Sequence, residues 1–390
     1  MRAFFPLVVG AGIVQFLIPS TLHNIIQEFH LGEGEGGLLP LVYFAGMMLS
    51  CVLITRLLQK LSVKTLIISG AALVSISLIA TSLSQWFAPF IPLLFLAGFG
   101  NGTLVILPGL YATNVLRDKS AGAQSALFVF LSVGTILGPL LPGLIEHLQI
   151  SWRWTFAFPG FLVLLLVIPV AITRLEHMGR VEILSFRFVR EMVSFDRRFF
   201  IGLVGALTLA GGGAQGISMW LVTFLENARG MVLGSAHLVL CGFAAGMLLG
   251  RLACGYVTTK GFSVYNTLII ITSGSAVLVL LAPLSHDATV DAVLFPVAAL
   301  FLAGIAPLLL AAAAVYPKSE SPSAYSLFYI AMSIGGAIIP YAVGHAFELV
   351  GTVAAMSSIS VLLLGLLGCL LFIRRELPIR EHAYYRAFAG

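Results

Sequence analysis

Charged residues are scarce in this sequence. Only 9% of its 390 residues are Asp, Glu, Lys or Arg, 59% are hydrophobic, and the mean hydropathy is +1.05. A soluble domain carries about 25% charged residues, so the composition excludes a soluble globular protein. The formal net charge of +5 comes from basic residues in short segments between apolar runs. That placement favours orientation in a lipid bilayer over binding of nucleic acid.

Cysteine is also rare, and the sequence motifs of several enzyme classes are missing. Cys51, Cys241, Cys254 and Cys369 lie singly inside apolar runs without a CxxC pair, as small buried hydrophobic side chains do. There is no HExxH or GxSxG motif and no acidic pair within an apolar run. An acyltransferase or intramembrane hydrolase would need such groups. We therefore predict that the protein is not an enzyme and has no cofactor or metal site.

Long apolar runs are abundant, and twelve of them can each span a bilayer as a helix of about 20 residues. If the N-terminus is cytoplasmic, all but two of the 21 Lys and Arg residues, Arg153 and Arg229, fall on the cytoplasmic side. This is a strong positive-inside bias. The sequence predicts an integral, multi-pass protein of the bacterial inner membrane with both termini in the cytoplasm. The predicted spans are 4–29, 36–58, 64–83, 88–116, 120–148, 152–174, 199–225, 231–258, 263–283, 290–316, 321–349 and 351–373.

The spans divide the chain into two halves. We expect an N-terminal six-helix bundle at 1–174, a cytoplasmic linker at 175–198, a C-terminal six-helix bundle at 199–375 and a cytoplasmic tail at 376–390. In the linker, apolar residues recur near helical spacing among arginines, which predicts an interfacial amphipathic helix. These apolar residues are Val181, Leu184, Phe188, Met192 and Phe195.

The two halves echo each other. LFLAG occurs at 94–98 and again at 300–304, an offset of 206, and each copy is followed by a Gly-rich run. Pro142 and Pro340 in these runs are 198 residues apart. An internal duplication of apolar helices is the simplest source of this echo. Parallel repeats in a membrane protein are typical of two-bundle secondary transporters.

Two motifs then resemble those of the major facilitator superfamily. One is similar to the Gly-Pro motif of that family's fifth helix, and the other to the WRW signature that opens its sixth. The residues are Gly134, Gly138, Pro139, Pro142 and Gly143 for the first, and Trp152, Arg153 and Trp154 for the second. The resemblance covers nearly the whole chain. It implies an all-α membrane protein with 12 transmembrane helices in two pseudo-symmetric six-helix bundles.

Within the superfamily, a weaker likeness connects the chain to the fucose-permease-like sugar transporters. It rests on three Gly-rich segments on spans four, seven and eleven. They are 98–102 with Asn101, 212–216 with Gln215, and 335–340 with Gly335, Gly336 and Pro340. The proton-coupled members of that subgroup use carboxylates on helices one and four, and this chain has none there.

The family resemblance implies that spans 1, 4, 7 and 10 line a central cavity. Gln15, Asn101 and Gln215 lie near the centres of three of these spans, and Trp220 and Tyr111 could stack on a ligand. Side-chain amides both donate and accept hydrogen bonds and so suit a polar substrate. In the alternative interpretation the amides bond neighbouring helices and the aromatic rings pack in the core.

Other residues are candidates for proton coupling and for gating. Without a carboxylate at the centre of a span, His23 or Glu28 is the candidate proton carrier, and a structural role for the histidine is the alternative. Arg251 either contacts an anion or snorkels to the headgroups. The glycines and prolines of the repeated runs permit close helix approach and bending. They are Gly134, Gly138, Pro139, Pro142, Gly335, Gly336 and Pro340.

These features favour a monomeric secondary transporter of a small neutral or zwitterionic organic solute that works by alternating access, with protons as a candidate coupling ion. An exporter of hydrophobic drugs, lipids, a metabolite or a chelate is the alternative transport function. A non-transporting sensor or scaffold derived from a carrier is the third hypothesis. The direction of transport is open.

Overall fold

The computed structural model describes residues 1–116, 120–176, 178, 184–259, 262–313 and 322–374, and within these ranges every regular element is an α-helix. Twelve helical segments are long and apolar enough to cross a membrane. The predicted all-α fold with 12 spans is therefore confirmed. Where a helix end lies among the described residues, it is within a few residues of the predicted end of that span.

The first half contains spans one to six and a short helix, α3 (Glu33–Gly36). Spans one and six are each divided into two helices. In chain order the spans are α1 (Phe4–Gln15) with α2 (Leu17–Phe29), α4 (Leu38–Leu57), α5 (Val63–Leu83), α6 (Phe90–Leu116), α7 (Ser120–His147), and α8 (Trp154–Leu166) with α9 (Ile168–Ile172).

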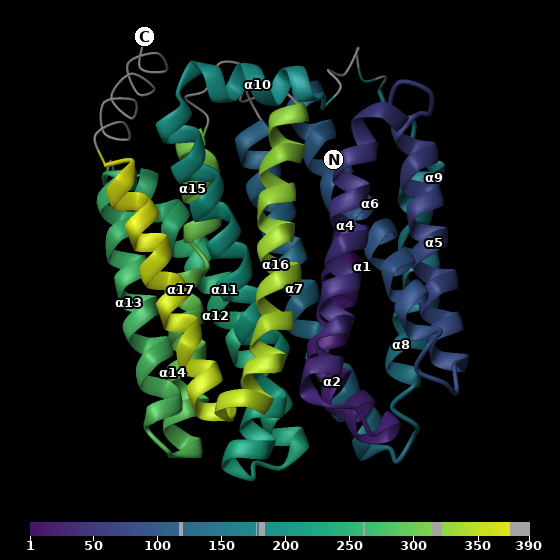
Figure 1. The fold of residues 1–390 in the computed structure, drawn as a ribbon. Helices are drawn as coiled ribbons and strands as arrows, with labels where there is room; N and C mark the ends of the chain where they lie inside the picture. Colours follow the sequence, from purple (N-terminus) through teal and green to yellow (C-terminus); the bar gives the residue numbers. More distant parts are fainter. Residues whose placement is uncertain (117–119, 177, 179–183, 260–261, 314–321, 375–390) are drawn as a thin grey trace.

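The second half repeats this order, and its fourth span, the tenth of the chain, is again divided. The spans are α11 (Arg197–Arg229), α12 (Leu233–Thr259), α13 (Val264–Leu284), α14 (Ala288–Leu302) with α15 (Ile305–Ala313), α16 (Pro322–Val350) and α17 (Thr352–Phe372). Between the halves, α10 (Phe186–Phe195) lies across one end of the molecule, at the top of Figure 1. We call this the linker end and the opposite end the far end.

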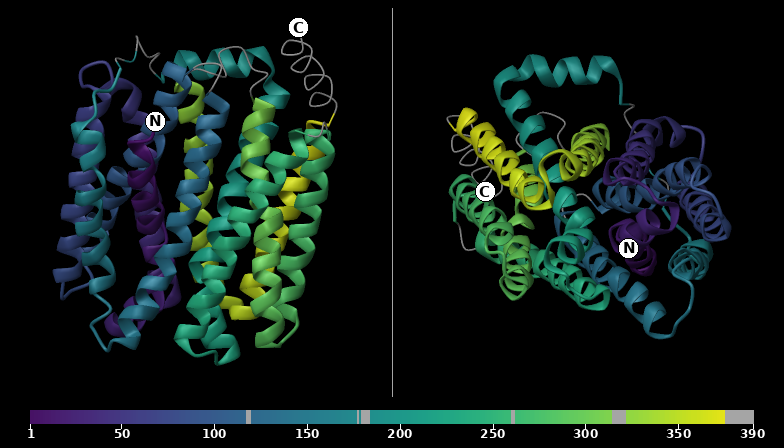
Figure 2. Two further views of the ribbon diagram at one scale, coloured as in Figure 1. Left: turned by 180° about the vertical axis from the view of Figure 1, so that it is seen from behind. Right: turned by 60° about the horizontal axis from the view of Figure 1, so that its bottom comes forward.

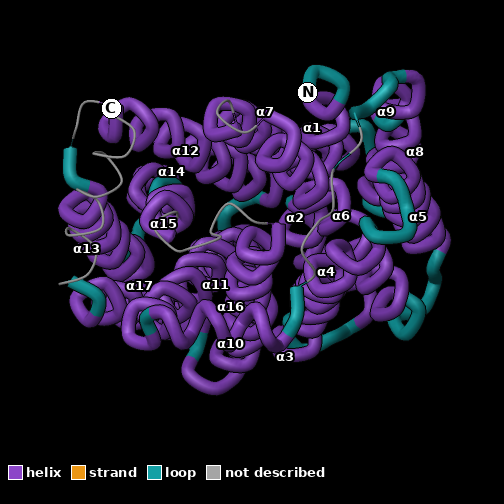
Figure 3. Tube along the Cα trace, turned by 90° about the horizontal axis from the view of Figure 1, so that it is seen from above, coloured by secondary structure: helices purple, strands orange, loops and turns teal. Residues whose placement is uncertain are grey.

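The halves lie side by side, and helices from both meet along two seams. Figure 2 shows the two groups of helices from behind and obliquely, and Figure 3 shows them from the linker end. Along one seam α4 packs against α16, and along the other α7 packs against α12. Any space between these seams is bounded by both halves of the chain.

Proline accounts for the interruptions in spans one and ten. Pro19 lacks an N–H and cannot bond the carbonyl of Gln15 four residues earlier, and α1 ends at Gln15. Pro307 removes the bond to the carbonyl of Ala303 in the same way, and α14 ends just before Ala303. Both interruptions lie mid-span, where freed backbone groups need other partners or a polar cavity.

The duplication is visible in how glycines pack. A Cβ at Gly134 on α7 would collide with the carbonyl of Val9 on α1, and a Cβ at Gly335 on α16 would collide with that of Thr208 on α11. Gly134 and Gly335 are 201 residues apart. The absence of a side chain therefore lets the same pair of helices approach closely in each half.

The same comparison corrects the offset inferred from the sequence. Gly46 on α4 would collide with Phe95, and Gly246 on α12 with Pro296, so Phe95 corresponds to Pro296 at an offset of 201. The two LFLAG copies, 206 apart, do not occupy equivalent places. By the same offset of 201, Pro340 corresponds to Pro139 and not to Pro142.

The linker contains a helix, α10, with one buried face. Ser185 caps α10 by accepting a hydrogen bond from the backbone N–H of Phe188, and Phe188 and Met192 are buried. Phe195 is 55% exposed and does not share that buried face. Val181 and the tail 376–390 lie outside the described residues, and the predicted domain boundaries remain a prediction.

Candidate functional site: a central cavity between the halves

A cavity of about 140 Å³ lies between the two halves and takes side chains from both. Most of its wall is apolar, with methionine, leucine, phenylalanine and alanine side chains. The lining residues used below are Gln15 on α1, Met47 on α4, Phe128 and Leu131 on α7, Gln215 on α11, Met247 and Arg251 on α12, Pro307 on α15, and Tyr329, Met332 and Ser333 on α16.

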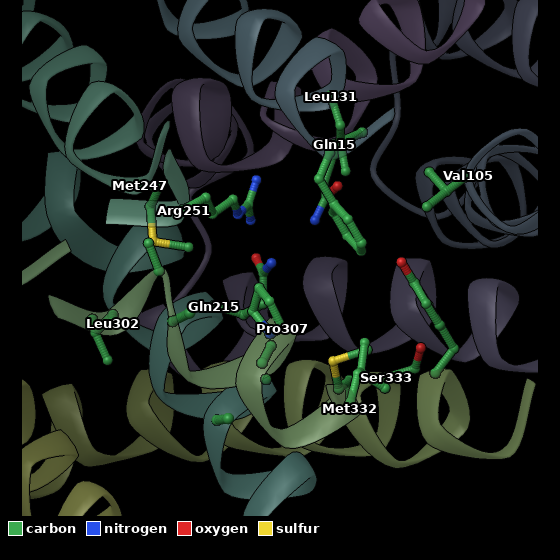
Figure 4. Close-up of a pocket in the computed structure, with 18 of the residues that line it drawn as sticks. Gln15, Val105, Leu131, Gln215, Met247, Arg251, Leu302, Pro307, Met332 and Ser333 are labelled. Carbon is green, nitrogen blue, oxygen red and sulfur yellow. The ribbon is translucent and has the colours of Figure 1, made fainter. Parts of the chain in front are cut away.

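Three polar head groups converge in this cavity. Figure 4 shows the guanidinium of Arg251 and the side-chain amides of Gln15 and Gln215 pointing toward one another. The glutamines are 200 residues apart and sit at corresponding places on the first span of each half. Arg251 has no such counterpart, because the position 200 residues earlier is Cys51, which is fully buried. The cavity therefore carries a symmetric pair of amides and an asymmetric cation.

The two predicted glutamines differ in how they are held. Gln15 is the last residue of α1, at the interruption that Pro19 causes, and its amide has no hydrogen-bond partner among the described residues. The Oε1 atom of Gln215 accepts a hydrogen bond of 3.3 Å from Ser218 Oγ. Both amides keep donors and acceptors for a ligand.

The sequence offers two roles for Arg251, contact with an anion or snorkelling to the headgroups. Its Nη1 donates to Ser132 Oγ of the other half at 2.5 Å, and its guanidinium lies 5.8 Å from the centre of the Phe128 ring. The side chain points into the cavity, where it is the sole charged group among the described lining residues. This place suits the first of the two roles, which stays a prediction.

Asn101 lies outside the cavity, on the buried side of α6. It is 0% exposed, and its Nδ2 donates to the Tyr43 hydroxyl at 2.7 Å and to the carbonyl of Ala11 at 3.2 Å. These bonds tie α6 to α4 and α1. The arrangement matches the alternative interpretation of this amide, and its substrate role stays a prediction without support from the cavity.

The two predicted stacking residues are also away from the cavity lining. Trp220 is 0% exposed, and its Nε1 donates to the carbonyl of Pro340 at 2.7 Å, joining α11 to α16. The Tyr111 hydroxyl accepts a hydrogen bond from the backbone N–H of Glu176 at 3.0 Å, near the linker end. Their roles as ligand platforms stay predictions, and the contacts are those of packing residues.

The remaining gating candidates fall into two groups. Gly134, Gly138 and Gly335 face backbone or Cβ atoms of a neighbouring helix, whereas Gly143 has open space. A Cβ on Gly336 would lie 3.2 Å from the Phe44 ring of the other half. Pro139, Pro142 and Pro340 lie inside the long helices α7 and α16. A sliding role for these residues stays a prediction.

The two proton-carrier candidates are in different surroundings. His23 on α2 lies across the boundary between the halves, with its Nδ1 2.9 Å from Glu226 Oε2 on α11. Glu28 stays within the first half, where it accepts hydrogen bonds from Arg153 and from Trp152 Nε1. A change in the charge of His23 would therefore act on a contact between the halves, whereas a change at Glu28 would act within the first half.

Further contacts close the far end. His237 Nε2 on α12 lies 2.8 Å from the carbonyl of Ser20, and the backbone N–H of Gly34 donates to Glu348 Oε1 at 2.9 Å. With the His23–Glu226 pair, they form what we call the far-end latch. Sequence reasoning missed Glu226, His237 and Glu348, because nothing local marks a residue that bonds the other half.

Comparison with known proteins agrees with this architecture. The profile of the Major Facilitator Superfamily matches residues 4–311. The chain belongs to the Major Facilitator Superfamily. As a member of this family it is a secondary transporter and not an enzyme, and it is an integral, multi-pass membrane protein.

Three proteins illustrate what this superfamily member is similar to. The cis,cis-muconate transport protein of Acinetobacter baylyi is 27% identical over 66% of this chain and 65% of its own. The chain thus spans slightly less than two thirds of that relative. A bacterial homologue of the lysosomal transporter spinster, in an inward-facing and occupied conformation, has a TM-score of 0.74 at 16% identity and 97% coverage of both chains.

The third is the fucose:proton symporter FucP of E. coli. It has a TM-score of 0.67 at 16% identity and covers 95% of this chain and 97% of its own. The predicted resemblance to the superfamily is confirmed, and its likeness to fucose-permease-like proteins extends to the fold. At such identities the solved structures speak for the fold alone.

Proposed function

We propose that this protein carries a small organic solute across the bacterial inner membrane by alternating access, with the central cavity as its binding site. The observation that carries the proposal is the convergence of Gln15 and Gln215, one from each half, on a single cavity. In alternating access the two halves rock about a central binding site, so a solute that contacts both halves can couple their movement to its own transport. The transport substrates named for relatives, muconate and fucose, differ in charge and leave the solute class open.

The size and the polarity of the cavity favour a small polar solute over the alternative of a hydrophobic drug or lipid. Sites for drug-sized ligands enclose about 300–1,000 Å³, and this cavity has about 140 Å³. Its amides would be left without partners by a wholly apolar ligand, at a cost of about 1–3 kcal/mol for each buried group.

The proposed orientation in the membrane rests on the distribution of basic residues. The linker end carries α10 and is the end at which most basic residues were predicted, so we place it in the cytoplasm. In this orientation the far-end latch joins the halves at the outer face, and we infer a cytoplasm-facing state. Protons are the proposed coupling ion, because the His23–Glu226 contact joins the halves and an imidazole and a carboxylate can exchange a proton.

Transport by the purified chain in proteoliposomes tests the proposal. A thermal-shift screen against small metabolites, repeated at several pH values, supplies the solute, and its time-dependent accumulation is then measured with and without a proton gradient. Absence of accumulation for every stabilising solute would instead support a sensor or scaffold.

A substitution in the site sharpens this test. Gln215→Ala removes a neutral hydrogen-bonding group, so we expect solute affinity to fall by roughly 3- to 10-fold. Gln27→Ala, at an exposed position of α2, is the matched control and should leave affinity unchanged. Equal affinity of the two variants would contradict a binding role for Gln215.

A further inference from the structure

We propose that the transported solute is a monocarboxylate with an apolar body, and that Arg251 binds its carboxylate. This inference rests on the proposed function and names the substrate class of the same cavity. It starts from a charge without a counterion: no acidic side chain is among the described lining residues, and the described ion pairs of the chain do not include Arg251.

A lone cation inside a membrane protein is costly. Placing arginine within a spanning helix is unfavourable, and such residues commonly mark ligand or ion pathways. Arg229, whose side chain is 4% exposed, is paired with a carboxylate by comparison. Arg229 Nε lies 2.6 Å from Asp291 Oδ2, and its Nη2 donates to the carbonyl of Pro283 at 2.6 Å. Arg251 has no such carboxylate among the described residues, and a bound anionic solute would supply the counterion.

The geometry of Arg251 leaves room for that counterion. A guanidinium has five N–H donors, and one of them has a described acceptor, Ser132 Oγ. The rest of the head group faces the cavity beside the amides of Gln15 and Gln215. The planar fork of arginine matches the two oxygens of a carboxylate and can donate to both.

The rest of the wall sets the remaining chemistry of the solute. Met47, Leu131, Met247 and Met332 offer an apolar surface, which suits a hydrocarbon or aromatic body. A zwitterion would bring an ammonium group for which no described lining residue supplies an anion, and a dicarboxylate would bring a second charge without a cation. One carboxylate matches the single positive charge of the cavity.

The experiment compares acids with their uncharged isosteres on the full chain in detergent. Small monocarboxylates such as benzoate, phenylacetate and isovalerate are tested by thermal shift and by equilibrium binding. Each is paired with its amide, and cis,cis-muconate and phenylalanine serve as the dicarboxylate and the zwitterion. We expect at least one monocarboxylate to bind, and its amide to bind about 30-fold more weakly or worse.

Substitutions of Arg251 test whether its guanidinium causes the preference for the acid over the amide. Arg251→Gln should weaken binding of the monocarboxylate by about 30-fold or more and leave binding of its amide unchanged. Arg251→Lys, which keeps the charge and loses the fork, should be intermediate. Arg190→Gln removes an exposed charge on α10 and controls for net charge.

Failure of this inference differs from failure of the proposed function. A neutral, zwitterionic or dianionic solute that binds and is transported with no monocarboxylate binding would overturn the substrate class and leave transport standing. Equal carboxylate affinity in Arg251→Gln and the wild type would overturn the role of Arg251. If no solute of any charge binds or accumulates, both fail.

Discussion

Amides that look alike in the sequence have different partners in the fold. Gln15 and Gln215 open onto the cavity, whereas Asn101 is enclosed by α1, α4 and α6 and donates to Ala11 and Tyr43. The arginines differ in the same way. Arg251 opens onto the cavity, whereas Arg153 and Arg229, the two arginines predicted on the outer side, bond to other protein groups. Arg153 donates to Glu28 and to the carbonyl of Ser84, and Arg229 pairs with Asp291. Each of these two arginines fastens spans within its own half.

A stability measurement distinguishes the two kinds of amide. Asn101→Ala leaves the Tyr43 hydroxyl and the Ala11 carbonyl without their donor, so we expect the free energy of unfolding to fall by about 1–3 kcal/mol. Solute affinity should stay the same. Gln15→Ala should show the reverse pattern, with weaker binding and little change in stability. Thermal unfolding and equilibrium binding on both variants check this, and weaker binding with Asn101→Ala at unchanged stability would restore its predicted substrate role.

At the scale of elements, helix interruptions and glycine contacts shape the cavity. The interruptions that Pro19 and Pro307 cause bring Gln15 and Pro307 to its wall. Close glycine contacts then hold α7 against α1 and α16 against α11. These pairs place Leu131 and Met332 at corresponding places of the lining, 201 residues apart.

Alanine substitutions within one motif test this packing. Gly134→Ala and Gly335→Ala place a methyl group against a backbone carbonyl, so we expect each to lower stability by roughly 1–3 kcal/mol. Gly143→Ala, in the same motif with open space around it, should be neutral or mildly stabilising, because alanine favours a helix over glycine by about 1 kcal/mol. Thermal unfolding of the three variants measures the difference. Equal stability of all three would contradict close approach at Gly134 and Gly335.

At the scale of the whole molecule, alternating access requires the far-end latch to open. His23–Glu226, His237–Ser20 and Gly34–Glu348 all join one half to the other. A hydrogen bond to a charged group contributes about 1.5–3 kcal/mol, so loss of the contact at Glu226 or Glu348 shifts the ratio of closed to open molecules by roughly 10- to 100-fold. The latch therefore sets how often the outer face opens.

Thiol labelling checks this balance. In a background lacking the four native cysteines, Ser20→Cys places a thiol at a position that is 1% exposed in this state. Adding Glu226→Gln removes the partner charge of His23 and should raise the maleimide labelling rate by roughly 10-fold or more. Glu35→Gln, an exposed acid that bonds within its own turn at Gly32, is the control. Equal rates in both variants would show that the His23–Glu226 contact does not hold this face closed.

The sequence alone determined the membrane class, the twelve spans, the superfamily and two of the cavity residues. Hydropathy and helix-forming runs are local properties, and Gln15 and Gln215 stand out because polar side chains are rare in such runs. Tertiary structure decided what local patterns do not contain. It separated Asn101, Tyr111 and Trp220 from the cavity, brought Arg251 into it, and paired His23 with Glu226 about 200 residues away. Contacts between two halves depend on their packing in space, and only that packing shows that Arg251 has no acidic partner among the described residues.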